Sequence, residues 1–257
     1  MIRADEYLPP RPGRELLTRL RVIDALEAAT VRGWTFVSAP AGFGKTVAVA
    51  QWLGRWRNRF AWATLDEYDD NEGRFARKFL GALSFAQKAN RKLALAAERT
   101  RAPFLEYLLD TLSLLLDNDK RYALVLDDVH CLTSQSVLKA LPMIQRRLPP
   151  GFSVILMGRG GVPDALVDLA LKGDMPVIGP DVLAMDEAEV RALLSRTGAE
   201  PSLAHGLLER TGGWPIAVGA LLMGDAARSE DLRGRELLCA GWTSTSGPAG
   251  ATNGGSS

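Results

Sequence analysis

The sequence predicts an α/β domain, built in three layers around a mostly parallel sheet and followed by a small all-helical module. Two observations lead to this fold class. As far as about residue 180, short apolar runs of strand length alternate with stretches of helical periodicity, the order that builds a parallel sheet covered by helices. Beyond Pro180 the apolar spacing is purely helical. With 257 residues the chain can bury a substantial core.

The apolar pattern predicts each element in turn. Strands are expected at 35–38, 60–65, 122–126, 152–157 and 175–178, where apolar residues follow one another as in strands buried on both faces. Helices are expected at 14–29, 47–53, 72–87, 103–116, 135–147, 186–196, 202–211 and 214–223, where they recur at helical spacing. Pro103 suits the first turn of its helix, whereas Pro142 is a candidate for a kink or break. Asp186 and Glu189 resemble a capping box.

These elements divide the chain into four parts. Residues 1–13, rich in proline, are expected to form an irregular arm, 14–180 the α/β domain, 181–225 the helical module and 226–257 a tail. From residue 240 onward the tail consists mostly of Gly, Ser, Thr and Ala and carries no charge. It cannot bury enough apolar surface to order itself. Such an ending is typical of a linker, a cloning scar or the out-of-frame end of an interrupted gene.

Composition and charge favour an ordinary globular protein. The net charge is +1, which by itself indicates neither a nucleic-acid nor a membrane surface. Cys131 and Cys239 lie far apart without metal-ligand spacing and are interpreted as reduced thiols. The sequence shows no signal peptide and no apolar run long enough to span a bilayer. We expect a cytoplasmic protein with no membrane partner.

The connection between the first expected strand and the next helix reads S-A-P-A-G-F-G-K-T, residues 38–46. Strand, glycine-rich turn and helix in this order are the context of a Walker A phosphate-binding loop. Gly42 and Gly44 can adopt backbone angles closed to other residues and leave room for a phosphate chain. Successive amides at the start of the helix would form a nest for anions. We therefore predict a P-loop NTPase domain that binds ATP or ADP.

Individual positions of this loop have expected roles. Lys45 would reach the β- and γ-phosphates, and the Thr46 hydroxyl would bind Mg²⁺. Ala39 stands where the general pattern has glycine, and a methyl group is compatible with strand-like backbone angles there. The alternative is a glycine-rich turn that binds nothing, which Lys and Thr after the second glycine disfavour. The expected nucleotide-binding residues of the loop are Ala39, Pro40, Ala41, Gly42, Phe43, Gly44, Lys45, Thr46 and Val47.

A second motif is the apolar run L-V-L followed by Asp127 and Asp128. A carboxylate at a strand tip beside the phosphate loop can hold Mg²⁺, the Walker B role that we assign to Asp127. Asp128 could orient or deprotonate the attacking water. The plainer interpretation is a strand that ends in a solvated turn. We favour the functional one because the motif follows a good phosphate loop at about eighty residues' spacing.

Arg159 directly follows the next expected strand, in the sequence M-G-R. A guanidinium at that tip could contact the γ-phosphate, so that the protein distinguishes ATP from ADP. A surface arginine in a glycine-rich loop explains the position equally well. His130, after the acidic pair, is interpreted as structural. Trp52, Trp56 and Trp62 lie among apolar residues and are expected in the core.

Taken together, the motifs resemble the N-terminal part of MalT-type LuxR-family regulators. The resemblance rests on S-A-P-A-G-F-G-K-T with Q-W, W-A-T-L-D-E-Y-D-D-N with R-F, L-V-L-D-D-V-H and G-G-W-P, in this order, and covers about residues 8–223. These proteins are bacterial transcription activators of the STAND class of signalling NTPases. Alanine at the first Walker A position is usual in that family.

The resemblance implies a molecular switch, in which ADP holds a resting form and ATP with an inducer favours a self-associating form that activates transcription. By matching position, Lys45 and Thr46 bind phosphates and Mg²⁺, Asp127 and Asp128 serve the metal and the water, and Arg159 is the sensor. Two further residues follow from the same match. Pro215 belongs to the family's G-x-P element and lies against the base, and Arg14 helps to cover the nucleotide.

Such regulators continue through a winged-helix module, a helical-repeat sensor and a helix-turn-helix that reads DNA. No second helix-turn-helix pattern and no basic recognition helix are visible in this sequence. We therefore expect a truncated switch module that binds ATP but neither operator DNA nor inducer by itself. The alternatives are a stand-alone P-loop ATPase or small-substrate kinase, and a fragment that binds former partners without using nucleotide.

Overall fold

The computed structural model describes residues 7–10, 16–56, 59–87, 90–115, 121–149 and 151–226. Arg14, most of the arm expected at 1–13 and all but the first residue of the tail expected at 226–257 lie outside the described residues. The chain divides into two compact units, 1–218 and 219–257. The first unit contains the whole sheet and the first turn of α11 (Pro215–Ala226), and the contacts described below lie within it.

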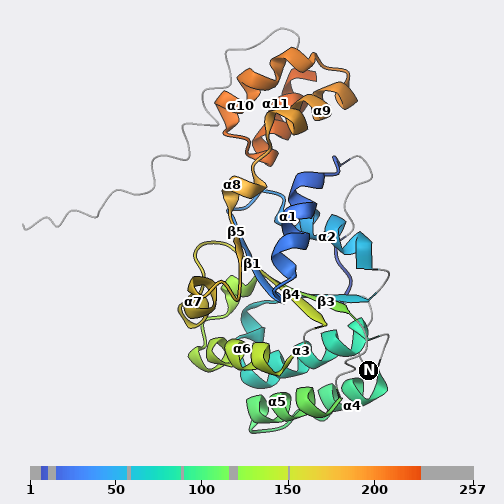
Figure 1. Cartoon of the computed structure of the whole chain (residues 1–257), viewed down its shortest axis with the longest axis vertical. Coiled ribbons are helices and arrows are strands. Elements are labelled where there is room, and N and C mark those ends of the chain that lie inside the picture. Colours follow the sequence, from blue (N-terminus) through green and yellow to red (C-terminus); the bar gives the residue numbers. More distant parts are fainter. Residues whose placement is uncertain are drawn as a thin grey trace, which may run out of the picture. The chain divides into compact units, whose positions relative to one another are not determined.

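Five strands form one sheet in the order β2-β3-β4-β1-β5, and every pairing between neighbours is parallel. The strands are β1 (Trp34–Ser38), β2 (Phe60–Thr64), β3 (Tyr122–Asp127), β4 (Phe152–Gly158) and β5 (Val177–Ile178). This topology confirms the predicted α/β class with a parallel sheet, and helices follow the last strand (Figure 1). Because β1 lies between β4 and β5, the strand that leads into the glycine-rich loop is an inner strand.

Helices cover both faces of this sheet (Figure 1). The α-helices are α1 (Leu20–Thr30), α2 (Lys45–Leu53), α3 (Glu72–Ala86), α4 (Arg91–Glu98), α5 (Phe104–Leu115), α6 (Gln135–Arg147), α7 (Asp164–Leu171), α8 (Pro180–Leu183), α9 (Glu187–Thr197), α10 (Ala204–Thr211) and α11 (Pro215–Ala226). Short 3-10 turns are η2 (Gly54–Trp56), η3 (Glu67–Asp69), η4 (Val129–Cys131) and η5 (Pro201–Leu203). Among the described residues, no helix combines the length and the hydropathy that crossing a membrane requires.

Two buried clusters explain why the sheet is covered twice. Successive side chains of a strand point to opposite faces. In β4, Val154 and Leu156 belong to the cluster under α3 to α7, whereas Ile155 and Met157 belong to the cluster under α1 and α2. Trp52, Trp56 and Trp62 all lie in the second cluster, as predicted.

The first helix is shorter than the sequence predicted. A helix was expected from Arg14, but α1 begins at Leu20, and residues 16–19 are not helical. The Gln51 side chain holds this segment in an open conformation: its Nε2 donates to the carbonyl oxygen of Leu17, 3.0 Å away, and its Oε1 accepts from the backbone amide of Arg19, 3.4 Å away. These long-range hydrogen bonds replace the helical ones that apolar spacing alone would favour.

Other predicted boundaries hold within a few residues. The helix expected at 135–147 runs through Pro142 without a break, because its buried side chains Leu141 and Ile144 pack into the core and offset the missing hydrogen bond. The last strand was expected at 175–178 and has only two residues, Val177 and Ile178. The capping box of Asp186 and Glu189 is present at the start of α9. Helices α4 and α7 were not predicted.

Candidate functional site

The loop between β1 and α2 turns through two glycines with left-handed backbone angles. Gly42 has φ +81° and Gly44 has φ +77°, and residues with a Cβ rarely adopt such angles. Gly44 is the residue that precedes α2, and it offers no side chain to cap this helix. The start of α2 therefore keeps backbone amides that an anion can accept from, which makes the loop a candidate phosphate cradle.

The Lys45 side chain folds back over this loop. Its Nζ donates to the carbonyl oxygen of Ala39 and to that of Pro40, the latter 3.1 Å away. Partial burial lowers the pKa of Lys45, the charge of Arg159 lowers it further, and the carboxylates of Asp127 and Asp128 act in the opposite direction. The Lys45 ammonium is therefore close enough to Arg159, Asp127 and Asp128 for their charges to affect its pKa. Thr46 follows in the first turn of α2 and is partly buried.

Asp127 closes β3 and is almost completely buried, with 8% of its surface exposed. Its Oδ1 accepts a hydrogen bond from the backbone amide of Asp128, 2.8 Å away. Burial raises the pKa of the Asp127 carboxyl to about 6, and the neighbouring charge of Asp128 contributes, while that amide hydrogen bond, Lys45 and Arg159 oppose the rise. Carboxylate oxygens are the ligands that Mg²⁺ prefers, so the adjacent Asp127 and Asp128 are the candidate metal ligands of this site.

Asp128 has a left-handed backbone, with φ +58° and ψ +38°. No other non-glycine residue in the described ranges has a positive φ. Aspartate tolerates this conformation better than most residues, at a cost of roughly 1–2 kcal/mol. The turn leads directly into η4, where His130 Nδ1 lies 3.6 Å from Asp128 Oδ1. Strain of this kind is frequent at functional sites.

Arg159 follows β4 and is exposed. Its guanidinium makes no ion pair or hydrogen bond with the part of the chain that the structure describes, although its charge acts on both Lys45 and Asp127. The neighbouring loop is tied to the end of β1, because the Ser38 hydroxyl donates to the carbonyl oxygen of Gly160. Arg159 therefore lies beside the other charged groups with its donors uncommitted to described residues.

The first turn of α11 packs directly on the glycine-rich loop. The Ile216 amide donates to the Gly42 carbonyl oxygen, 3.2 Å away, and Trp214 Nε1 donates to that of Ala41, 3.1 Å away. The rings of Phe43 and Trp214 are stacked, with centroids 6.4 Å apart. A Cβ added to Gly42 would lie 2.5 Å from Ile216 Cγ2, so the contact leaves no room for a methyl group. This contact brings the G-x-P element onto the loop.

The structure thus gathers the predicted site residues from three strand ends. Lys45 lies beyond β1, Asp127 ends β3 with Asp128 next to it, and Arg159 follows β4, which pairs with both of the other strands. Arg14 lies outside the described residues. Sequence reasoning had assigned no role to Trp214 and Ile216, whose hydrogen bonds to the loop join residues more than 170 positions apart. No local pattern could have revealed these bonds.

The fold and this site define the class of protein. A central parallel strand, a glycine-rich loop and a helix, in a sheet of order 2-3-4-1-5, are the architecture of a P-loop ATPase domain. The fold implies nucleotide binding. The sequence prediction of this class is confirmed.

Comparison with known proteins identifies relatives. The chain is 28% identical over 215 residues to the HTH-type transcriptional regulator MalT of Vibrio campbellii, and equally so to that of Vibrio parahaemolyticus. Each match covers 81% of this chain and 24% of the relative, so the chain spans about a quarter of the length of these curated relatives. The chain is homologous to the N-terminal portion of MalT regulators, which confirms the resemblance drawn from its motifs.

Two other comparisons add little to this relationship. No family model matches the chain. The solved structure of Cdc6p from Pyrobaculum aerophilum is similar with a TM-score of 0.45 and 16% identity, over 86% of this chain and 64% of that one.

Proposed function

We propose that this chain is an ATP/ADP-binding switch module of a MalT-like transcriptional regulator. The observation that supports it best is the convergence of Lys45, Asp127, Asp128 and Arg159 at the carboxyl edge of the sheet, beside an uncapped helix start. Homology to the N-terminal portion of MalT supports the regulatory role. We further propose that the module works in the cytoplasm, which supplies ATP.

The residues present fit a nucleoside triphosphate with Mg²⁺. The amides of the loop, residues 39–47, hold the phosphates, and Lys45 exchanges its two carbonyl partners for phosphate oxygens. Thr46 and Asp127 would hold Mg²⁺, whose charge would offset that of the phosphates. Asp128 orients the attacking water. Pro215 lies next to the base, a role supported by the packing of its helix turn on the loop.

The switch requires contacts that only ATP can make, because a ligand shifts an equilibrium only by binding one state better than the other. Arg159, whose donors are uncommitted to described residues, gains an anionic partner when a γ-phosphate is present. The loop is hydrogen-bonded to Trp214 and Ile216 at the start of α11. We propose that this contact carries the change onward and that the ATP-bound form self-associates, whereas slow hydrolysis resets the module with ADP retained.

Calorimetric titration with ATP and Mg²⁺ tests this function. Lys45→Ala is expected to weaken ATP binding roughly 100-fold or more, because charge-assisted hydrogen bonds to phosphate are lost. Lys139→Ala removes an exposed lysine on α6 and is the matched control, expected to bind like the unmodified chain. Unchanged affinity in a folded Lys45→Ala protein would reject the assignment. Steady multiple turnover without a partner would argue for an ordinary ATPase instead of a switch.

A further inference from the structure

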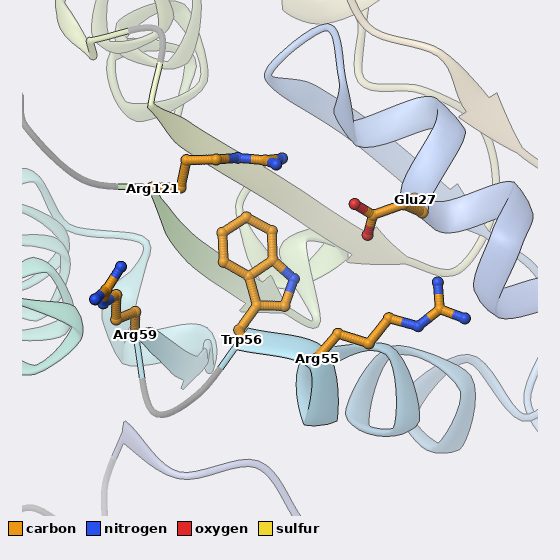
Figure 2. Close-up of a pocket in the computed structure, with 5 residues that line it drawn as sticks. All are labelled: Glu27, Arg55, Trp56, Arg59 and Arg121. Atoms are coloured by element: carbon orange, nitrogen blue, oxygen red, sulfur yellow. The ribbon is translucent and has the colours of Figure 1, made fainter.

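A pocket with several charged lining residues lies at the amino ends of the strands, on the edge of the sheet opposite to the glycine-rich loop. Its volume is about 510 Å³, open solvent included, and it is lined by Glu27, Arg55, Trp56, Arg59 and Arg121 (Figure 2). The arginines come from separate segments. Arg55 lies in η2, Arg59 just before β2 and Arg121 just before β3, whereas Glu27 belongs to α1. The fold thus places three arginines around one tryptophan, on different sides of its ring (Figure 2).

The tryptophan forms a fixed wall of this pocket. Trp56 is only 9% exposed, and its ring packs on that of Trp52, with centroids 5.1 Å apart. The Arg121 guanidinium lies over the Trp56 ring, its central carbon 5.2 Å from the ring centroid, and extends across the indole toward the Glu27 side of the pocket (Figure 2). A guanidinium held against an aromatic face keeps its N–H edges available for a second partner. Arg121 is therefore positioned before any ligand arrives.

Positive charge in the pocket exceeds the negative charge that the described residues supply. Among the described residues that line the pocket, Glu27 is the one acidic residue, and its Oε2 accepts a hydrogen bond from Trp52 Nε1, 2.8 Å away. Arg55 Nη2 lies 3.0 Å from Asp24 Oδ1, an exposed pair that contributes little. Within the described ranges, neither Arg59 nor Arg121 has a carboxylate within ion-pair distance. An excess of positive over negative charge among the described residues favours an anionic ligand.

We propose that this pocket binds a small anion that carries a phosphate group, at a site separate from the phosphate loop. Arginine is the side chain best shaped for phosphate oxygens, because its planar fork donates two parallel hydrogen bonds. A nucleic-acid backbone is the weaker candidate, because the chain as a whole has a net charge of only +1.

Calorimetry with inorganic pyrophosphate tests the proposal, in a Lys45→Ala background that weakens the phosphate loop. One saturable site is expected. Arg121→Gln should weaken binding at least about tenfold, because a bidentate charged contact is lost. Arg121→Lys, which keeps the charge without the planar fork, should fall between the two. Arg59→Gln provides a second lining variant, and Arg146→Gln, an exposed arginine on α6, is the control with the same change of charge.

Several results decide between the possible ligands. If AMP or glucose 6-phosphate binds more tightly than pyrophosphate, the ligand is an organic phosphate. If they bind with the same affinity as pyrophosphate, the pocket recognises the phosphate group alone. In both cases the affinity should depend on Arg121. Pyrophosphate binding that is absent, or that persists unchanged in folded Arg121→Gln and Arg59→Gln proteins, overturns the proposal. It is also overturned if a short DNA duplex binds through Arg121 while the small phosphates do not.

Discussion

At the scale of single residues, the candidate site carries a cost to stability in the absence of ligand. Asp127 is buried next to Asp128, which raises its pKa from 3.8 to about 6. Its folded-state pKa therefore exceeds the unfolded value, so folding favours the protonated form. The stabilising contribution is complete below pH 3.8 and is lost as the pH rises to about 6. At neutral pH the buried carboxylate of Asp127 lowers the stability of the ligand-free protein, and a bound cation would offset this loss.

Asp127→Asn should therefore stabilise the ligand-free protein above pH 6, by up to about 3 kcal/mol, since one pKa unit corresponds to about 1.4 kcal/mol. The gain should shrink as the pH is lowered toward 4. Urea unfolding without nucleotide or Mg²⁺, at several pH values, measures this difference. Asp168→Asn, at an exposed position of α7, is the control and should show no comparable gain. A constant difference across this pH range would contradict the burial argument.

Arg159→Gln tests the proposed discrimination between nucleotides. Removing the guanidinium should lower the affinity for a non-hydrolysable ATP analogue about tenfold, because one charged contact to the γ-phosphate is lost, and should leave the affinity for ADP nearly unchanged. Calorimetric titrations with both nucleotides give the ratio. Equal losses for both ligands would mean that Arg159 does not read the third phosphate.

Residue identities in the candidate site were accessible from the sequence because each motif is local. Lys45 follows its glycines directly, and the acidic pair follows its strand directly. The backbone angle of Asp128 and the contact of Trp214 with the loop were not accessible. Both depend on contacts between segments that are distant in the sequence, and a local sequence pattern does not predict such contacts.

At the scale of elements, prediction succeeded where the apolar signal was strong. The strands β3 and β4 are continuous apolar runs, and their bounds differ from the prediction by one residue. Helix α4 was missed, because its buried face consists of Leu93 and two alanines, a weak hydrophobic signal. The predicted start of α1 was wrong, because the Gln51 side chain bonds the backbone of Leu17 and Arg19 in place of helical hydrogen bonds.

The contact between the first turn of α11 and the loop leads to a prediction about two glycines. Gly42→Ala should destabilise the ligand-free protein by roughly 2–4 kcal/mol, because it adds both a left-handed alanine and a clash with Ile216. Gly44→Ala has a similar φ but no atom within 4 Å of the added Cβ, and should lose only about 1–2 kcal/mol.

Urea unfolding of the two variants measures the difference. Adding Ile216→Ala should recover part of the loss in Gly42→Ala, since it removes the atom nearest to the new methyl group. The same double change made with Gly44→Ala should be additive. Equal losses at the two glycines would show that the helix turn does not pack on the loop in solution.

At the scale of the whole molecule, the fold class was predictable from the alternation of strands and helices, since few topologies satisfy it. The order of strands was not, because the pairing of β1 with β4 and β5 depends on crossovers that leave no local mark. Homology to a quarter of the length of MalT regulators indicates which larger protein this domain resembles.

Self-association belongs to this scale. Sedimentation velocity should show a larger species with a non-hydrolysable ATP analogue than with ADP, if the nucleotide shifts the population between two packings. Arg159→Gln should reduce that difference, because it removes the contact on which the discrimination depends. Identical sedimentation with both nucleotides, at concentrations that saturate the site, would argue against the switch.

The strand order also has a consequence for the growing polypeptide. Trp34 pairs with Val154 and Ser38 with Gly158, so β1 acquires its first partner only after more than a hundred further residues have been synthesised. Contacts between such distant segments form slowly. Ribosome-bound chains that stop before Phe152 should therefore fail to retain ATP, whereas chains long enough to expose β5 should retain it. Filter binding of stalled chains of graded length would reveal at which residue the site first becomes competent.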